Sequence, residues 1–300
     1  MKPFLLTAFA LSAFAFNSIL CRMALGKEEI DPAGFTAVRV LAGAVTLTFL
    51  SLFFKPRYVE SVGLGVKPSR TRGLLHSGNW TSAFFLFAYA LCFSFAYLGL
   101  TTATGALILF GAVQMTMIAA SIIKGERPGM WELMGIAVAF GGLVYLVLPG
   151  LTSPPLVSSL LMALAGAAWG FYTLRGRTSV DPLADTTGNF IRAVPMAAVS
   201  VIPFIGGLHL SVRGVVLAVL SGALASGVGY SVWYAALKYH TATRAAVLQL
   251  AVPAIAAAGG VLLLSESAET RLLVASFLIL GGILLAIFGK NASRMRKPAR

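Results

Sequence analysis

Long uninterrupted apolar runs dominate the hydrophobic pattern of this 300-residue chain. Residues 3–21 contain no Asp, Glu, Lys or Arg, and neither do residues 73–123 or residues 133–174. A helix needs about 20 mostly apolar residues to cross a bilayer, so the first run predicts one span and each longer run must fold back into two. Because backbone polar groups in lipid need internal partners, we expect every span to be helical.

Turn residues divide the two longest runs. We place one turn at residues 99–102, and another where Pro149-Gly150 and Pro154-Pro155 interrupt the second run. The remaining spans are predicted at residues 33–54, 184–205, 213–237, 243–264 and 271–289. The pattern therefore predicts an all-α integral membrane protein with ten transmembrane helices.

Composition and charge agree with a membrane protein. Hydrophobic residues make up 58% and charged residues 11% of the chain, whereas soluble domains have roughly 45–50% and about 25%. The net charge of +13 comes from bases scattered between apolar runs, which argues against a nucleic-acid partner. With the N-terminus placed in the cytoplasm, 17 of the 23 Lys and Arg residues fall at cytoplasmic ends. The positive-inside rule therefore predicts that both termini are cytoplasmic.

The two halves of the chain resemble each other. Residues 16–22 align with residues 169–175 at an offset of 153, and the same offset carries Arg39 onto Arg192. Five helices per half is an odd number, so the second repeat (151–300) must lie upside down relative to the first (1–150). Inverted repeats are common in secondary transporters, whose substrate site lies near the midplane between the halves. A gene duplication without a transport role is the alternative.

An ordered set of motifs resembles the drug/metabolite transporter superfamily, in particular its EamA-type members. The motifs are Trp169-Gly170, Arg175, residues 234–239 (YAALKY), residues 241–246 (TATRAA), Pro253, Ser265-Glu266 and Gly281-Gly282. The second half is closer to this pattern than the first, in which Asn17 stands where many relatives have Gly and Gln114 stands opposite Pro253. Residues 78–117 resemble bacterial inner-membrane exporters of aromatic and other amino acids.

This resemblance implies inverted five-helix repeats, a central cavity walled by both halves, and export of small metabolites across a bacterial inner membrane. We therefore expect a small-molecule substrate, with amino acids including aromatic ones favoured, moved by alternating access. The lipid bilayer is the other expected partner, and a monomer is compatible with the sequence. The alternatives are a transporter of drugs or other metabolites, an integral membrane enzyme, or a lipid scramblase.

The acidic residues all fall near predicted helix ends or in loops. An intramembrane carboxylate is the usual proton relay and the usual partner of a lipophilic cation, so the pattern argues against a proton/drug-cation antiporter. The three histidines lie far apart, and the sequence has no HExxH or Ser/His/Asp arrangement. We expect neither enzymatic activity nor a metal or other cofactor.

Polar and aromatic side chains inside the spans are the candidate substrate-binding residues. A polar group that faces lipid is costly, so the amides should face the interior or a water-filled cavity. Aromatic residues three apart share a helix face and can wall a cavity for an apolar side chain. The candidates are Asn17, Asn79, Trp80, Gln114, Trp169, Tyr172, Tyr230, Trp233 and Gln249. The alternative is that they pack against or hydrogen-bond neighbouring helices.

Three further features have open interpretations. Arg39 and Arg192 are candidates for gating or for attracting a carboxylate, and the alternative is that they snorkel or hold loop acids such as Asp31 and Asp185. Pro253 lacks an N–H, so the carbonyl of Gln249 loses its helical donor and a kink is expected there. The glycine pairs 141–142 and 281–282 mark close helix packing or hinges.

Overall fold

The computed structural model of the protein describes residues 2–53, 77–123, 125, 129–148, 153–177, 179–237, 239–240, 245, 248–267 and 269–295. Within these ranges the chain is helical, and the only pairing of β type is an isolated bridge between Ile30 and Leu210. The elements are α1 (Lys2–Leu25), α2 (Pro32–Phe53), α3 (Trp80–Ala96), α4 (Thr102–Ile123), α5 (Met130–Val147), α6 (Leu156–Gly176), α7 (Pro182–Val201), η2 (Ile202–Gly207), α8 (Val212–Leu220), η3 (Ser221–Val228), α9 (Gly229–Leu237), α11 (Ala251–Leu264) and α12 (Thr270–Met295).

Eight helical segments in the described residues are long and apolar enough to cross a membrane. The apolar helices α3 and α11 are shorter, with 17 and 14 residues. The prediction of an all-helical membrane protein is therefore confirmed. That α3 and α11 also cross, which would make ten spans, stays a prediction.

The helix boundaries follow the turn residues that the sequence offers. Pro154-Pro155 directly precede α6, because a proline is tolerated before or at the first turn of a helix. The last helix extends to Met295, six residues beyond its predicted end at 289. The predicted turn at Pro149-Gly150 and most of the motif 241–246 lie outside the described residues.

The predicted span 213–237 is continuous, but its middle is not an α-helix. Residues Ser221–Val228 form the π-helix η3 between α8 and α9. Small residues fill this segment, and a Cβ on Gly222 would meet the backbone carbonyl of Arg39 on α2. Single-turn π segments are frequent at functional sites, so the side chains that this irregular turn contacts are candidates for a functional role.

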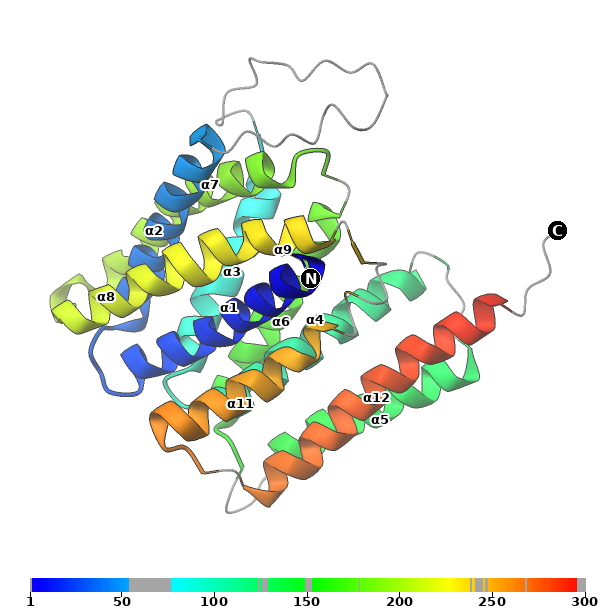
Figure 1. The fold of residues 1–300 in the computed structure, drawn as a ribbon. Coiled ribbons are helices and arrows are strands. Elements are labelled where there is room, and N and C mark those ends of the chain that lie inside the picture. Colours follow the sequence, from blue (N-terminus) through cyan, green and yellow to red (C-terminus); the bar gives the residue numbers. More distant parts are fainter. Residues whose placement is uncertain are drawn as a thin grey trace, which may run out of the picture.

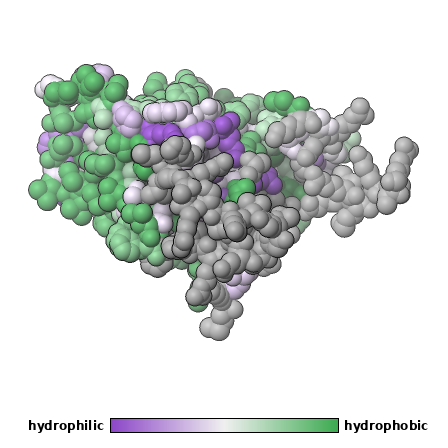
Figure 2. All heavy atoms as spheres, turned by 90° about the horizontal axis from the view of Figure 1, so that it is seen from above, coloured by the Kyte–Doolittle hydropathy of each residue, from purple (hydrophilic) through white to green (hydrophobic). Residues whose placement is uncertain are grey.

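The outer surface of the bundle is apolar. Exposed large side chains include Val45 on α2 at 62%, Leu262 on α11 at 80% and Phe277 on α12 at 80%. Seen from above in Figure 2, hydrophobic residues occupy much of the margin, while hydrophilic residues gather in a band toward the middle. Apolar exposure on this scale is not tolerated in water, and it identifies the surface that lipid covers.

Helix pairs exchange partners between the two halves of the chain. In the first half α3 packs against α6 and α7, and in the second half η3 and α9 pack against α1 and α2. Likewise α4 packs against α6, whereas α11 packs against α1. Three further pairs, α2 with α7, α4 with α11 and α5 with α12, also join the two halves, and α5 and α12 run side by side at one edge of the bundle in Figure 1.

Glycines set the spacing of the α5–α12 pair. A Cβ on Gly282 would lie 2.5 Å from the backbone nitrogen of Ala139, and one on Gly142 would lie 2.8 Å from Cβ of Leu278. Around their neighbours Gly141 and Gly281, no atom lies within 4 Å of the place that a Cβ would take. Within each pair, therefore, one glycine permits close backbone approach and the other faces outward.

We predict that Gly282→Ala destabilises the protein and that Gly281→Ala does not. The first methyl group would force two helix backbones apart, at a cost of about 1–3 kcal/mol. The second enters open space and raises helix propensity by up to about 1 kcal/mol. Thermal unfolding in detergent, followed by tryptophan fluorescence, measures both variants. Equal shifts of the two midpoints would contradict this packing.

Candidate functional site

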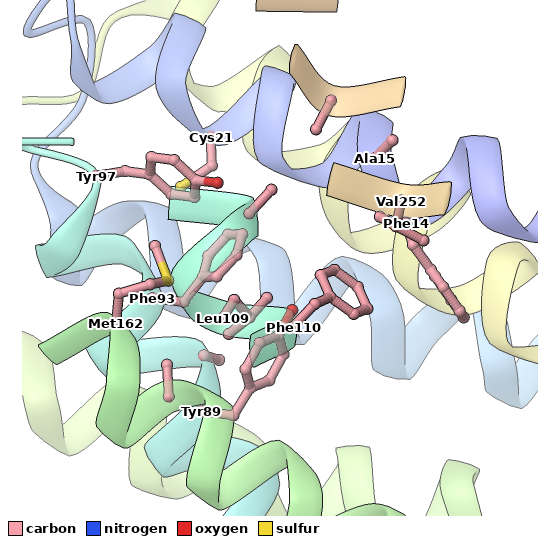
Figure 3. Packing of buried hydrophobic residues seen from close by; sticks show 14 of the residues in the cluster. Phe14, Ala15, Cys21, Tyr89, Phe93, Tyr97, Leu109, Phe110, Met162 and Val252 are labelled. Atoms are coloured by element: carbon pink, nitrogen blue, oxygen red, sulfur yellow. The ribbon is translucent and has the colours of Figure 1, made fainter. Parts of the chain in front are cut away.

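A small cavity lies at the centre of the bundle, between helices of both halves. Its volume is about 20 Å³, which is room for about one water molecule. It is lined by Phe14, Asn17, Ser18, Tyr89, Phe93, Leu109, Phe110, Trp169, Ala225 and Tyr230. These residues come from α1, α3 and α4 of the first half and from α6, η3 and α9 of the second. Figure 3 shows Tyr89 and Phe93 on α3 beside Leu109 and Phe110 on α4.

Trp169 is the centre of the aromatic wall. Its ring centroid lies 4.9 Å from Tyr89, 4.9 Å from Tyr230 and 5.4 Å from Tyr172. Phe14 packs edge-on against Tyr230 and Trp233, in each case at 5.8 Å. Of the four predicted aromatics of α6 and α9, Trp169 and Tyr230 therefore line the cavity, whereas Tyr172 packs against Trp169 and Trp233 packs against Phe14.

A chain of buried polar side chains runs beside this wall. Ser221 Oγ donates to Asn17 Oδ1 at 2.6 Å, and Asn17 Nδ2 donates to the Tyr89 hydroxyl at 3.2 Å. Arg39 Nη2 donates to the same hydroxyl at 2.8 Å. The chain connects η3, α1, α3 and α2, so the π-helical turn contributes directly to the site. Buried polar groups need such partners, and here they leave polar atoms next to an aromatic cavity.

Arg39 is almost fully buried, with 2% of its surface exposed. Its Cζ lies 5.1 Å from the ring centroid of Tyr89 and 5.0 Å from that of Phe93. Nη1 has no hydrogen-bond partner among the described residues, and the ion pairs found there join Arg22 to Glu266 and Arg213 to Glu29. Burying an ion costs several kcal/mol, and a desolvated aromatic face returns about 2 kcal/mol. The site thus holds a positive charge that its rings stabilise without neutralising.

Arg192 has a different environment, although the repeat aligns it with Arg39. Its Nη1 donates to the carbonyls of Gly188 at 2.9 Å and Ser77 at 2.5 Å, and its Cζ lies 6.0 Å from the Trp80 ring centroid. It therefore ties α7 to the segment that precedes α3. This place is apart from the central cavity.

Asn79 and Trp80 also lie apart from the cavity. Asn79 caps α3 by accepting a hydrogen bond from the Ser82 N–H at 2.9 Å, and it accepts another from Arg175 Nη2 at 3.0 Å. Trp80 is the first residue of α3 and is 59% exposed. Both were predicted as substrate-binding residues, but the structure places them at the end of a helix.

The two predicted glutamines do not line the cavity either. Gln114 is 3% exposed, one turn beyond Phe110 on α4, and its Nε2 has no partner in the described part of the chain. Gln249 is half-buried and precedes α11, which begins at Ala251. Pro253 therefore falls in the first turn of α11, where the missing N–H is tolerated. The expected kink inside a long helix is replaced by a helix start.

The sequence did not single out Phe14, Tyr89, Phe93 or Phe110 as binding residues. Helices α3 and α4 are apolar on every face, so hydrophobic periodicity gives no direction toward the cavity. The one available signal was the hydroxyl of Tyr89, because a polar atom in the middle of a span needs an internal partner.

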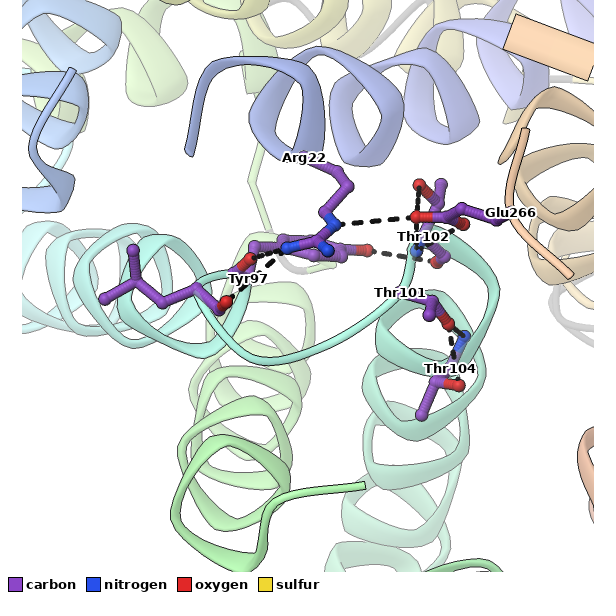
Figure 4. A network of polar contacts seen from close by, with 7 residues as sticks. Arg22, Tyr97, Thr101, Thr102, Thr104 and Glu266 are labelled. Atoms are coloured by element: carbon purple, nitrogen blue, oxygen red, sulfur yellow. Dashed lines mark hydrogen bonds and ion pairs between the residues drawn. The ribbon is translucent and has the colours of Figure 1, made fainter. Parts of the chain in front are cut away.

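A polar network closes the end of the bundle where α1, α3 and α11 finish. The Glu266 carboxylate accepts from the N–H of Thr102 at 2.9 Å and 3.0 Å and from its hydroxyl at 3.2 Å. Arg22 Nε lies 3.5 Å from Glu266 Oε1, and Arg22 Nη1 donates to the Tyr97 carbonyl at 3.0 Å (Figure 4). Glu266 thus places a negative charge at the N-terminus of α4, where the helix dipole favours it.

A second hollow, of about 250 Å³, opens at the same end between the starts of α4 and α12. Its lining includes Thr101, Thr104, Glu269 and Arg271, and it shares no residue with the central cavity. Because both halves converge on the central cavity with aromatic and polar groups, that cavity is the better candidate for a binding site.

Comparison with known proteins gives a consistent family. The model of the EamA-like transporter family matches residues 156–288. An uncharacterised protein of Pseudomonas aeruginosa is 47% identical over 299 residues, covering 100% of this chain and 98% of its own. A probable amino-acid metabolite efflux pump of Salmonella typhimurium is 25% identical, covering 92% of this chain and 91% of its own.

A crystal structure of another protein has the same fold. It aligns with a TM-score of 0.62 at 18% identity and covers 95% of this chain and 96% of that one. The second half, which the family model matches, is also the half that carries most of the sequence motifs. Together with the multi-pass helical fold, these matches show an EamA-like transporter family domain in the second half of the chain and support a membrane transporter of the drug/metabolite transporter superfamily.

Proposed function

We propose that the protein exports small organic metabolites, with amino acids including aromatic ones as the favoured substrates. The observation that carries this proposal is the cavity walled by Tyr89, Trp169 and Tyr230, with Asn17 and Arg39 supplying polar groups beside it. Apolar walls with a few convergent polar groups suit a small amphipathic ligand. The name of the Salmonella relative, a probable amino-acid metabolite efflux pump, supports the same substrate class.

Ten spans arranged as two inverted five-helix repeats, 1–150 and 151–300, are part of this proposal. The partner exchange among helices supports it: α3 packs on α6 and α7, while η3 and α9 pack on α1 and α2. A two-fold axis in the membrane plane would relate these pairs. The same axis would also pass between the two helices of each of the pairs α2–α7, α4–α11 and α5–α12, at the interface where transporters of this type bind substrate.

Alternating access through this interface requires closed ends that can separate. At one end the Ser211 N–H donates to the Glu29 carbonyl at 2.9 Å, and the Asp31 N–H donates to that of His209 at 3.0 Å. At the other end the Gly78 N–H donates to Asp185 Oδ1 at 2.9 Å. The Asn79 N–H donates to Asn189 Oδ1, also at 2.9 Å. Both ends join the two halves by a few hydrogen bonds. A metabolite fits the 20 Å³ cavity only after the helices around it move apart.

The charge distribution supports an orientation with both termini in the cytoplasm of a bacterial inner membrane. It places 17 of the 23 Lys and Arg residues at cytoplasmic ends. The end closed by Arg22 and Glu266 then faces outward, and a monomer contains the complete cavity. The buried guanidinium of Arg39 next to the cavity disfavours organic cations among drug-like substrates.

We predict that Trp169→Ala lowers the rate of transport per folded protein by up to about tenfold. A substrate ring would lose one aromatic contact worth up to about 1.5 kcal/mol, which corresponds to that factor. The measurement is saturable flux of labelled phenylalanine in liposomes, normalised to monodisperse protein. Trp131→Ala is the matched control, because Trp131 on α5 is 57% exposed and remote from the cavity. Equal rates in both variants would count against this site, and absence of saturable flux for every amino acid tested would count against the function.

We predict that Glu266→Gln opens the outer end more often. It removes the ion pair with Arg22 and the negative charge at the start of α4. Losing about 1 kcal/mol of this closure raises the open population roughly fivefold. The buried thiol of Cys21 reports this opening through its rate of labelling by a membrane-impermeant maleimide on intact cells, in a Cys92→Ala background.

The control for this experiment is Glu28→Gln. Glu28 is an exposed residue of the same connection as Glu29, and its side chain makes no hydrogen bond or ion pair within the described structure. Its replacement should leave the labelling rate of Cys21 unchanged. If both variants label at the rate of the parent protein, the Glu266 network is not part of the closure.

A further inference from the structure

Arg39 has no anionic or backbone-carbonyl partner in the described residues, unlike four other arginines of the bundle. Arg22 and Arg213 pair with glutamates, and Arg192 and Arg271 donate to backbone carbonyls. Arg39 has one neutral acceptor, the Tyr89 hydroxyl, two aromatic faces, and a buried Nη1 left without a partner. Such an arrangement leaves the guanidinium ready to take an anion.

One layer of rings separates this guanidinium from the cavity. Tyr89 and Phe93 line the cavity on one side, and the Cζ atom of Arg39 lies 5.1 Å and 5.0 Å from their centroids. The Tyr89 hydroxyl accepts from Arg39 and also from Asn17, which itself lines the cavity. A rotation of either ring, as the helices separate to admit substrate, gives a ligand access to Nη1.

The cavity has no matching negative charge. None of its lining residues is an acid, and in the described structure every Asp and Glu lies in a connection or in the first turn of a helix. A substrate ammonium therefore finds aromatic faces and amide oxygens there, but no carboxylate. The positive charge beside the cavity favours the acidic end of a substrate over its basic end.

We propose that Arg39 binds the carboxylate of the substrate, so that the site takes monocarboxylates with an apolar or aromatic body and does not require an ammonium group. This inference rests on the proposed transport through the central cavity and specifies its substrate class. Aryl-substituted hydroxy acids belong to that class as much as aromatic amino acids do, whereas the amines formed by decarboxylation do not. Arg192, which the repeat aligns with Arg39, has carbonyl partners and takes no part.

Three probes that share one ring system test this assignment: L-phenylalanine, phenyllactate and phenethylamine. Binding to the purified full-length chain in detergent is measured by isothermal titration calorimetry at neutral pH. We expect phenyllactate to bind within about threefold of phenylalanine. Phenethylamine should bind about 10- to 100-fold more weakly, the factor expected when a hydrogen bond to a charged group is lost. Equal binding of the amine and the acids would overturn the role of Arg39.

Variants of the two aligned arginines complete the test. Arg39→Met should bring the affinity ratio of acid to amine close to one, and Arg39→Lys should retain a preference for the acids because it keeps the charge. Arg192→Met should leave the ratio at the parent value, whatever it does to yield. A parent-like ratio in Arg39→Met would overturn the proposal even if transport is intact. If none of the three probes binds and no metabolite shows saturable flux, the proposed function fails with it.

Discussion

The interior of a bilayer offers no water, so every polar group within the spans needs a partner inside the protein. This constraint organises the centre of the molecule. Ser221, Asn17 and Tyr89 form hydrogen bonds with one another across three helices, and the Tyr89 hydroxyl also accepts a hydrogen bond from Arg39. The same contacts hold the aromatic wall around Trp169 in place. A cavity with polar atoms beside rings is therefore a consequence of satisfying buried groups where both halves of the chain meet.

The constraint also explains why two aligned arginines differ. Arg192 lies in the middle of α7, and its side chain donates to the carbonyl of Gly188 on the same helix and to that of Ser77 in the segment before α3. Arg39, on α2, is 2% exposed, and its one hydrogen bond among the described residues goes to the hydroxyl of Tyr89 on α3. An internal repeat in sequence thus need not give equal environments. In the proposed inverted arrangement, equivalent positions meet connections of different length, and of the two arginines only Arg39 lacks an anionic or carbonyl partner in the described residues.

The sequence could predict an all-helical membrane protein, and it marked the glycine pairs 141–142 and 281–282 as sites of close packing or hinges, because long apolar runs and paired glycines are local signals. It could also pair Trp169 with Tyr172 and Tyr230 with Trp233, since residues three apart share a helix face. It could not give the inward face of α3 and α4, which are apolar all round, and so it missed Phe93 and Phe110. Asn79 was misplaced because an amide before an apolar run is also a helix cap, the role it has here.

The weak hydrogen bonds at the two ends of the bundle fit the proposed alternating access, in which each end opens in turn. Each closure consists of a few hydrogen bonds, with a net value of about 1 kcal/mol apiece. An exposed ion pair such as Arg213–Glu29 adds at most about 1 kcal/mol. A ligand bound with micromolar affinity supplies about 8 kcal/mol, and only the part that differs between conformations shifts their populations. The weak closures and the uncompensated charge of Arg39 are therefore complementary, since a substrate carboxylate is stabilised most in the conformation that brings it to the guanidinium.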